Sequence, residues 1–102
     1  MTYPDPHLKR ILWYLIGGTK GGPMRGKILS ILKERPLNAN QLAEQLSVDY
    51  RTVQHHLKVL QENQLLVPSK AGAYGALYFH TPKLEQSWDL FLEIWSKTGK
   101  GR

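Results

Sequence analysis

A run of hydrogen-bonding side chains within residues 49–61 is the part of this sequence best equipped to contact a ligand. Val53, Leu57 and Leu60 recur at the spacing of one helix face, which predicts that they point inward. The outward positions of the same helix are Tyr50, Arg51, Thr52, Gln54, His55 and Lys58. The only acidic residue at the start of this segment is Asp49, which is expected to cap the helix.

These residue types suit a DNA duplex. A helix fits the major groove, and the residues near its N-terminus reach the base edges. Arg51 can bond guanine O6 and N7, and Gln54 can bond adenine N6 and N7. Tyr50, Thr52 and Lys58 are better placed for phosphates. Because a polar face is also common on solvated helices, the interpretation depends on the elements around this helix.

Other kinds of site lack their residues. The chain has no cysteine, which excludes disulfides and thiolate metal sites. His55 and His56 are adjacent and would point about 100° apart on a helix, while His7 and His80 are isolated. The glycine-rich residues 17–23 contain no Gly-Lys-Ser or Gly-Lys-Thr, as a phosphate loop requires. We therefore predict no enzyme, no catalytic residues, no metal and no cofactor.

Length and net charge limit the classes of protein to which this sequence can belong. The 102 residues fit one domain, and the net charge of +6 favours an anionic partner, nucleic acid first. The longest apolar run is residues 11–16, far below the roughly 20 residues that cross a membrane. The first residues lack a basic segment and a cleavage site, so we expect no signal peptide.

Hydrophobic periodicity predicts the surrounding elements. A mainly helical (α+β) fold is expected, with a winged helix-turn-helix in one domain over residues 1–102. Its parts are an N-terminal helix over residues 5–16, a helix-turn-helix core over 23–67, a two-stranded wing over 65–80 and a C-terminal helix over 83–96.

Local signals refine these elements. Asn38 and Gln41 have the spacing of a capping box, with Asn in place of Ser or Thr. Ser47 stands at the turn where this motif usually has glycine, so an adjusted backbone is expected there. Arg25 and Lys27 are expected to point away from the buried face of their helix.

Three stretches within this frame resemble the ArsR-type winged-helix repressors. They are residues 23–29 (PMRGKIL), 42–46 (LAEQL) and 55–60 (HHLKVL), of which the last is fairly specific. Together with the glycine-rich connector, the layout is also similar to small archaeal regulators of this group. The similarity is close over about half of the chain and extends to the rest by layout.

The resemblance implies a sequence-specific regulator of transcription, a repressor in the cytoplasm. It implies a homodimer on double-stranded DNA, with recognition helices in adjacent major grooves and wings on the backbone. Arg51, Thr52, Gln54 and His55 inherit the base or phosphate contacts by position, whereas His56 is expected to pack on the core. Metal sensing does not carry over, because the chain has no cysteine and residues 83–96 contain no histidine; any small-molecule effector is unknown.

Two further sets of residues complete the predicted sites. Contacts to the DNA backbone are expected from the wing and from the start of the second core helix, at Lys70, Tyr74, Asn38, Asn40 and Gln41. The two ends of the chain carry more apolar residues than a small three-helix core should cover, which favours a dimer interface. That interface is expected at Leu8, Ile11, Leu12, Leu15, Leu84, Trp88, Phe91 and Trp95.

Two alternative functions stay open at this point. Winged-helix domains also serve as protein-interaction modules, but such modules lose the basic recognition face that Arg51, Gln54, Lys58 and Lys70 provide here. A chromatin-type protein that coats DNA without reading bases is compatible with the charge of +6. Only a ratio of specific to non-specific affinity separates that protein from a regulator.

Overall fold

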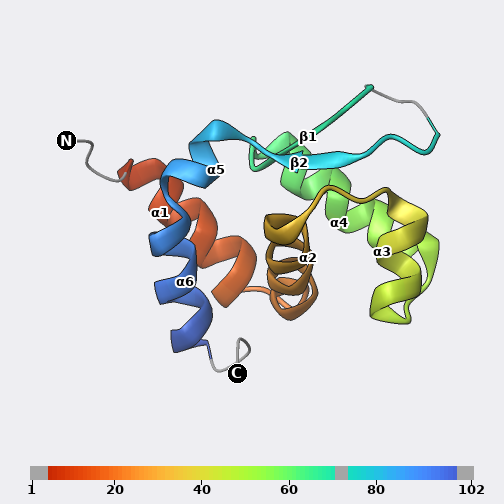
Figure 1. The fold of residues 1–102 in the computed structure, drawn as a ribbon. Helices are drawn as coiled ribbons and strands as arrows, with labels where there is room; N and C mark the ends of the chain where they lie inside the picture. Colours follow the sequence, from red (N-terminus) through yellow and green to blue (C-terminus); the bar gives the residue numbers. More distant parts are fainter. Residues whose placement is uncertain (1–4, 71–73, 99–102) are drawn as a thin grey trace.

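The computed structural model describes residues 5–70 and 74–98. Helices dominate, and the only sheet in these residues is a two-stranded antiparallel hairpin (Figure 1). The elements in order are α1 (Pro6–Leu12), the π-helical turn η1 (Trp13–Gly17), α2 (Gly22–Glu34), α3 (Ala39–Leu46), α4 (Tyr50–Glu62), β1 (Leu66–Pro68), β2 (Tyr78–His80), α5 (Pro82–Gln86) and α6 (Trp88–Lys97). None of these helices is both long and apolar enough to cross a lipid bilayer.

The helix starts follow the capping signals of the sequence. The Asp5 carboxylate accepts from the backbone N–H of His7 at the start of α1, and Thr81 accepts from Leu84 at the start of α5. Asn38 and Gln41 form the expected capping box of α3. These bonds satisfy N–H groups that have no partner inside the helix.

Several predicted boundaries shift. The helix expected over residues 5–16 is α-helical to Leu12 and then widens into η1. The helix expected over residues 83–96 is interrupted at Ser87, which separates α5 from α6. Asp49 is the N-cap of α4 by position, but its side chain makes no capping bond.

The turn between α3 and α4 sets the angle of the helix-turn-helix. Ser47 ends α3 in the left-handed conformation, with φ 56° and ψ 45°, as its position in place of glycine suggested. The Val48 N–H then donates to the carbonyl of Ala43 at 3.0 Å. A left-handed residue followed by this bond is a common way to end a helix and redirect the chain.

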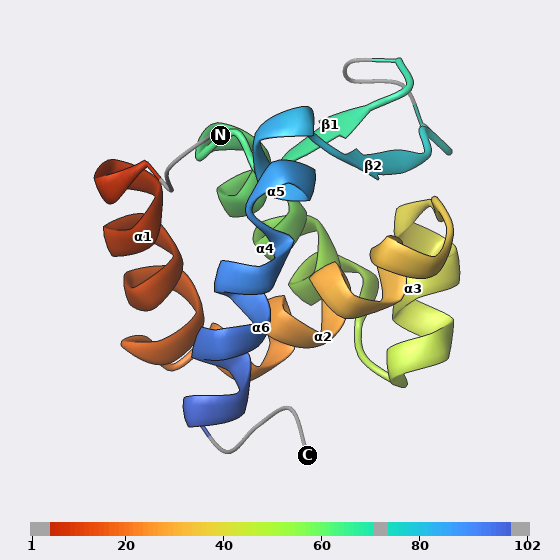
Figure 2. The ribbon, with the colours of Figure 1, turned by 60° about the vertical axis from the view of Figure 1, so that its left-hand side comes forward.

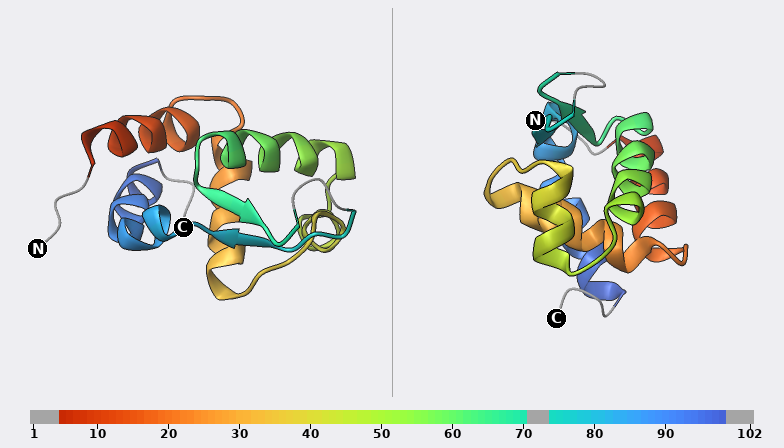
Figure 3. Two further views of the ribbon diagram at one scale, coloured as in Figure 1. Left: turned by 90° about the horizontal axis from the view of Figure 1, so that it is seen from above. Right: turned by 90° about the vertical axis from the view of Figure 1, so that its right-hand side faces the viewer.

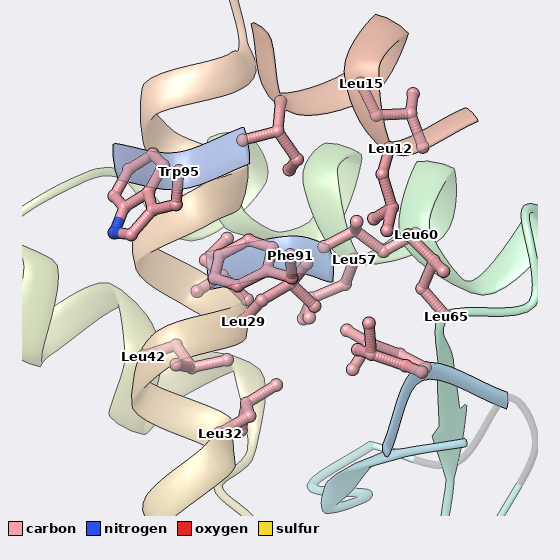
Figure 4. Close-up of a cluster of buried hydrophobic side chains, with 14 of the residues drawn as sticks. Leu12, Leu15, Leu29, Leu32, Leu42, Leu57, Leu60, Leu65, Phe91 and Trp95 are labelled. Carbon is pink, nitrogen blue, oxygen red and sulfur yellow. The ribbon is translucent and has the colours of Figure 1, made fainter. Parts of the chain in front are cut away.

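The core lies where α2, α4 and the terminal helices meet. Leu29 of α2, Leu57 of α4 and Phe91 of α6 are fully buried, and Figure 4 shows Phe91 between α2 and α4. Each such side chain contributes about 1.5–3 kcal/mol through burial. Figure 2 shows α1 and α6 side by side, so the terminal helices extend the core rather than stand apart from it.

This arrangement corrects the predicted dimer interface. Six of its eight residues have at most 8% of their surface exposed in the single chain, so they hold the terminal helices to their own chain. They are Leu8, Leu12, Leu15, Leu84, Phe91 and Trp95. Ile11 and Trp88 are partly buried and pack against the same core. The sequence argument assumed a small three-helix core, but α1, η1 and α6 enlarge it.

The aromatic stripe of the last helix closes this core. Trp88 stacks on Phe91 with ring centroids 4.4 Å apart, and Phe91 lies 5.9 Å from Trp95. Trp95 lies across α2 at Gly26 (Figure 4). A β-carbon at Gly26 would overlap the Trp95 ring, so the close approach of α6 to α2 requires glycine at this position.

We predict that Gly26→Ala destabilises the protein by about 1–3 kcal/mol, because the added methyl overpacks the contact with Trp95. Helix propensity alone predicts the opposite, a gain of about 1 kcal/mol. Urea unfolding followed by circular dichroism measures the difference. Gly18→Ala is the control, since a β-carbon there meets its nearest atoms at an ordinary 3.5 Å. Equal or greater stability of Gly26→Ala would contradict the packing argument.

Candidate nucleic-acid interface

The residues that α4 buries determine which of its side chains face outward. Val53, Leu57 and Leu60 are 0–1% exposed and fix the rotation of the helix against the core. Arg51 and Lys58 are therefore held in solvent, as are the other outward side chains, Thr52, Gln54 and His55. Tyr50, at the first position of α4, is half-buried and packs against the core.

A hollow of about 540 Å³ opens along this face. Its lining residues are Arg51, Gln54, His55, Lys58, Gln61 and Tyr78. Five of them come from α4, and Tyr78 comes from β2 of the wing, which runs beside α4 (Figure 3). The lining contains two permanent cations and several donors but no carboxylate, so it is suited to an anionic ligand with hydrogen-bonding edges.

A second hollow, of about 280 Å³, lies between the wing, α4 and the start of α3. It is lined by Ala39, Tyr50, Gln54, Tyr74, Gly75, Ala76 and Tyr78. Gln54 and Tyr78 therefore line both hollows. The Asn40 amide donates to the Tyr74 hydroxyl at 2.8 Å, which joins the wing to α3.

The structure separates the residues predicted to contact the DNA backbone. Tyr74 lines the second hollow and is bonded to Asn40, and both residues are exposed. The side chains of Asn38 and Gln41 are instead engaged with the backbone of the α3 cap, at 2.8 Å each. Lys70 is exposed beyond β1 and lines neither hollow.

Sequence reasoning missed Tyr78 and Gln61. In the hairpin, Tyr78 pairs with Pro68 and shares an isolated bridge with Leu37, which turns its side chain toward α4. The alternation of side chains along residues 76–80 predicts that Tyr78 and Phe79 point to opposite faces of the strand. Which of them points toward α4 depends on how the wing packs, and the sequence does not give this. Gln61 lies about one helical turn after Lys58 on the same face, so extending the predicted face by one turn would have included it.

A buried polar network around Arg25 contacts the inward face of α4 through His56. Arg25 is 5% exposed rather than outward-facing as predicted, and it donates from Nε to the Leu15 carbonyl at 3.0 Å. Its other nitrogens donate to the Thr19 hydroxyl and, at 3.2 Å, to His56 Nδ1. A guanidinium has no acceptor, so His56 Nδ1 accepts and the His56 ring is neutral. Residues of η1, the glycine-rich connector, α2 and α4 thus meet at one guanidinium.

The protein environment shifts the pKa values of both His56 and Arg25 in this network. Burial, then the Arg25 charge and then His55, lower the pKa of His56 to about 4. Burial also lowers the pKa of Arg25, which remains a cation at neutral pH. Gly21 lies against both side chains, and a β-carbon there would collide with the Arg25 guanidinium.

A second polar cluster anchors the base of the wing. His80 contacts Glu85 Oε2 through Nδ1 at 2.6 Å and the Leu29 carbonyl through Nε2 at 2.8 Å. Lys33 donates to the other oxygen of Glu85 at 2.9 Å, and this bond lowers the pKa of Glu85. Glu85 of α5 therefore joins α2 and β2 to its own helix. Within the described residues, no group of three or more His, Asp or Glu could hold a metal ion.

Comparisons with known proteins agree with this geometry. Residues 22–66 match the family described as bacterial regulatory protein, arsR family. The transcriptional repressor SdpR of Bacillus subtilis (strain 168) is 27% identical over 75 residues, which cover 74% of this chain and 83% of SdpR. The family match runs from the start of α2 to the first residue of β1 and so includes all of α4.

Solved structures share the fold. A probable transcriptional regulator from Pseudomonas aeruginosa superposes with a TM-score of 0.67 at 19% identity, over 93% of this chain and 74% of that one. Lactococcus lactis ZitR, solved in complex with DNA, gives 0.61 at 22% identity, over 95% and 75%. The predicted fold class, a mainly helical winged helix, is confirmed.

We predict that acid destabilises the chain through His56. Between pH 6.5 and about 4 the unfolded state binds a proton at His56 that the folded state does not, so the free energy of unfolding falls as pH falls. The loss is about 2–3 kcal/mol across this range. His56→Asn, whose Oδ1 can still accept from Arg25, is the matched control because it does not titrate. Urea unfolding at several pH values compares the two, and parallel curves would contradict the prediction.

Proposed function

We propose that this chain, whose residues 22–66 match the arsR family of bacterial regulatory proteins, represses transcription as a sequence-specific homodimer on DNA. The family is regulatory, in agreement with the prediction that the chain is not an enzyme. The relative SdpR is named a transcriptional repressor, and ZitR was solved in complex with DNA, which supports the same role here.

The observation that carries the proposal is the lining of the larger hollow along α4, which contains no carboxylate. Arg51, Gln54, His55 and Lys58 are exposed along one helix face and line one hollow. The net charge of +6 supplies the sequence-independent attraction to phosphates. A protein-interaction module would not need this concentration of donors on the helix that fits the major groove.

The proposed complex assigns a task to each element. Residues near the start of α4 reach the base edges, with Arg51 on guanine and Gln54 on adenine. Thr52 and Lys58 contact phosphates. The wing, with Lys70 beyond β1, follows the backbone beside the groove. A duplex partner also places the protein inside the cell.

Dimerisation would use surface that the single chain leaves exposed. On the N-terminal and C-terminal helical segments, the exposed large apolar residues are Trp13, Tyr14 and Leu92, at 36%, 65% and 46%. Apolar side chains of this size in solvent favour an interface. A two-fold dimer would present two copies of α4 to successive turns of a duplex.

We predict that selection from a random DNA library at about 0.15 M salt enriches an inverted repeat, because phosphate-only binding is weak at this salt concentration. Half-sites spaced by about one helical turn, or a multiple of it, are expected for two copies of α4. Arg51→Ala should lose the preference at one position of each half-site, whereas Arg10→Ala, an exposed cation of α1, should keep it.

Two outcomes would contradict this function. Binding without enrichment would indicate a protein that coats DNA. Absence of binding would favour a protein-interaction module.

We predict that the wild-type protein sediments at twice the 11.7 kDa mass of one chain and that Leu92→Glu shifts it toward the monomer. A carboxylate at an exposed position leaves the core intact but is costly in an apolar interface. Gln86→Glu, at an exposed position of α5 in the same C-terminal segment, is the control. Sedimentation equilibrium gives the masses. A monomeric wild type, or unchanged dimers for both Leu92→Glu and Tyr14→Glu, would reject this interface.

A further inference from the structure

A hydrogen bond between two residues of α4 controls the orientation of a proposed base-reading side chain. Gln54 lies one helical turn after Tyr50, and its Nε2 donates to the Tyr50 hydroxyl at 3.0 Å. Side chains four residues apart lie on the same face of a helix, so this bond forms without distortion. Tyr50 was expected on a phosphate, but the structure gives its hydroxyl a partner inside the protein.

Tyr50 is the fixed member of this pair. It is half-buried and packs against the hydrophobic core, whereas Gln54 is exposed. Its ring lines the smaller hollow with Tyr78 of the wing, and Tyr78 is itself held by a bond from its N–H to the Leu37 carbonyl at 2.9 Å. The orientation of the Gln54 amide is therefore set by groups that belong to the core and to the base of the wing.

The bond to Tyr50 determines which hydrogen-bonding groups of Gln54 remain free for a ligand. A glutamine amide has two N–H donors and one carbonyl acceptor. Tyr50 takes one donor, so one N–H and the Oε1 acceptor remain for a ligand. Adenine presents the complementary pair in the major groove, the N6 donor and the N7 acceptor. Gln54 lines the larger hollow with Arg51, which places this donor–acceptor pair at the face proposed to meet the bases.

We propose that Tyr50 is a positioning residue that sets the base preference of Gln54 by holding its amide in the orientation that suits adenine. The inference rests on the proposed function, because it assumes that α4 reads a duplex. Tyr50 itself needs no contact with a base. Holding an exposed glutamine in advance removes part of the entropy that its ordering would otherwise lose on binding.

The test measures base preference in a double-mutant cycle. The selected operator, and three versions of it with each other base at the position where Gln54→Ala loses its preference, are titrated with wild type, Tyr50→Phe, Gln54→Ala and the double variant. Tyr50→Phe removes one hydroxyl, so we expect the preference for adenine to fall about twofold to tenfold, the range of one hydrogen bond. In the Gln54→Ala background, where this preference is already absent, the same change should cost no further affinity for the selected operator.

Tyr74→Phe is the matched control. It also removes a phenol hydroxyl that lines the smaller hollow, but that hydroxyl bonds Asn40 rather than Gln54. Any change in affinity should be equal for all four bases, so the preference is retained. Thermal unfolding of each variant shows whether a loss of folding contributes.

Three results would overturn the proposal. An unchanged preference in Tyr50→Phe would show that Gln54 needs no positioning. An equal loss of affinity for the selected operator when Tyr50→Phe is added to Gln54→Ala would show that Tyr50 contacts DNA itself. No loss of preference in Gln54→Ala would remove the residue that Tyr50 is proposed to position. A wild type that selects no DNA sequence would instead refute the proposed function, and the two failures are thereby distinct.

Discussion

The burial of one face of α4 is the constraint on which the rest of this structure depends. Val53, Leu57 and Leu60 are in the core, so the rotation of the helix about its axis is fixed. Once that rotation is fixed, the residues that meet solvent follow from helix geometry alone. The wing, the two hollows and the Tyr50–Gln54 bond are all placed relative to that exposed face.

Two polar clusters hold the parts of the chain that hydrophobic packing positions less tightly. Arg25 joins the connector after η1 to His56 on the back of α4, and its three partners are all neutral. Since a buried cation without a carboxylate is stabilised only by hydrogen bonds, each of these acceptors matters. His80 and Glu85 perform a similar task at the base of the wing, where β2 meets α2.

The helix-turn-helix was predictable from the sequence because its signals are local. The capping box at Asn38, the left-handed Ser47 and the periodicity of α4 each involve residues within one or two helical turns. The exposed residues of the candidate site followed from the same periodicity. The burial of Arg25 and the position of Tyr78 could not be predicted, because both depend on partners that are distant in the sequence. Buried residues of the terminal helices were assigned to an interface for the same reason, because their partners within the chain are distant in the sequence, as Gly26 is from Trp95.

The division of α4 into a buried and an exposed face has a consequence for how its specificity can be altered. The side chains that stabilise the fold and those that line the larger hollow occupy different positions, with no residue shared between Val53, Leu57 and Leu60 and the lining set. Substitutions at Arg51, His55 or Lys58 change the ligand-facing surface without creating a cavity in the core. Selection or design can therefore alter the side chains proposed to contact DNA while the packing of the core is kept. Gln54 differs from these three positions, because replacing it also leaves the Tyr50 hydroxyl without its partner.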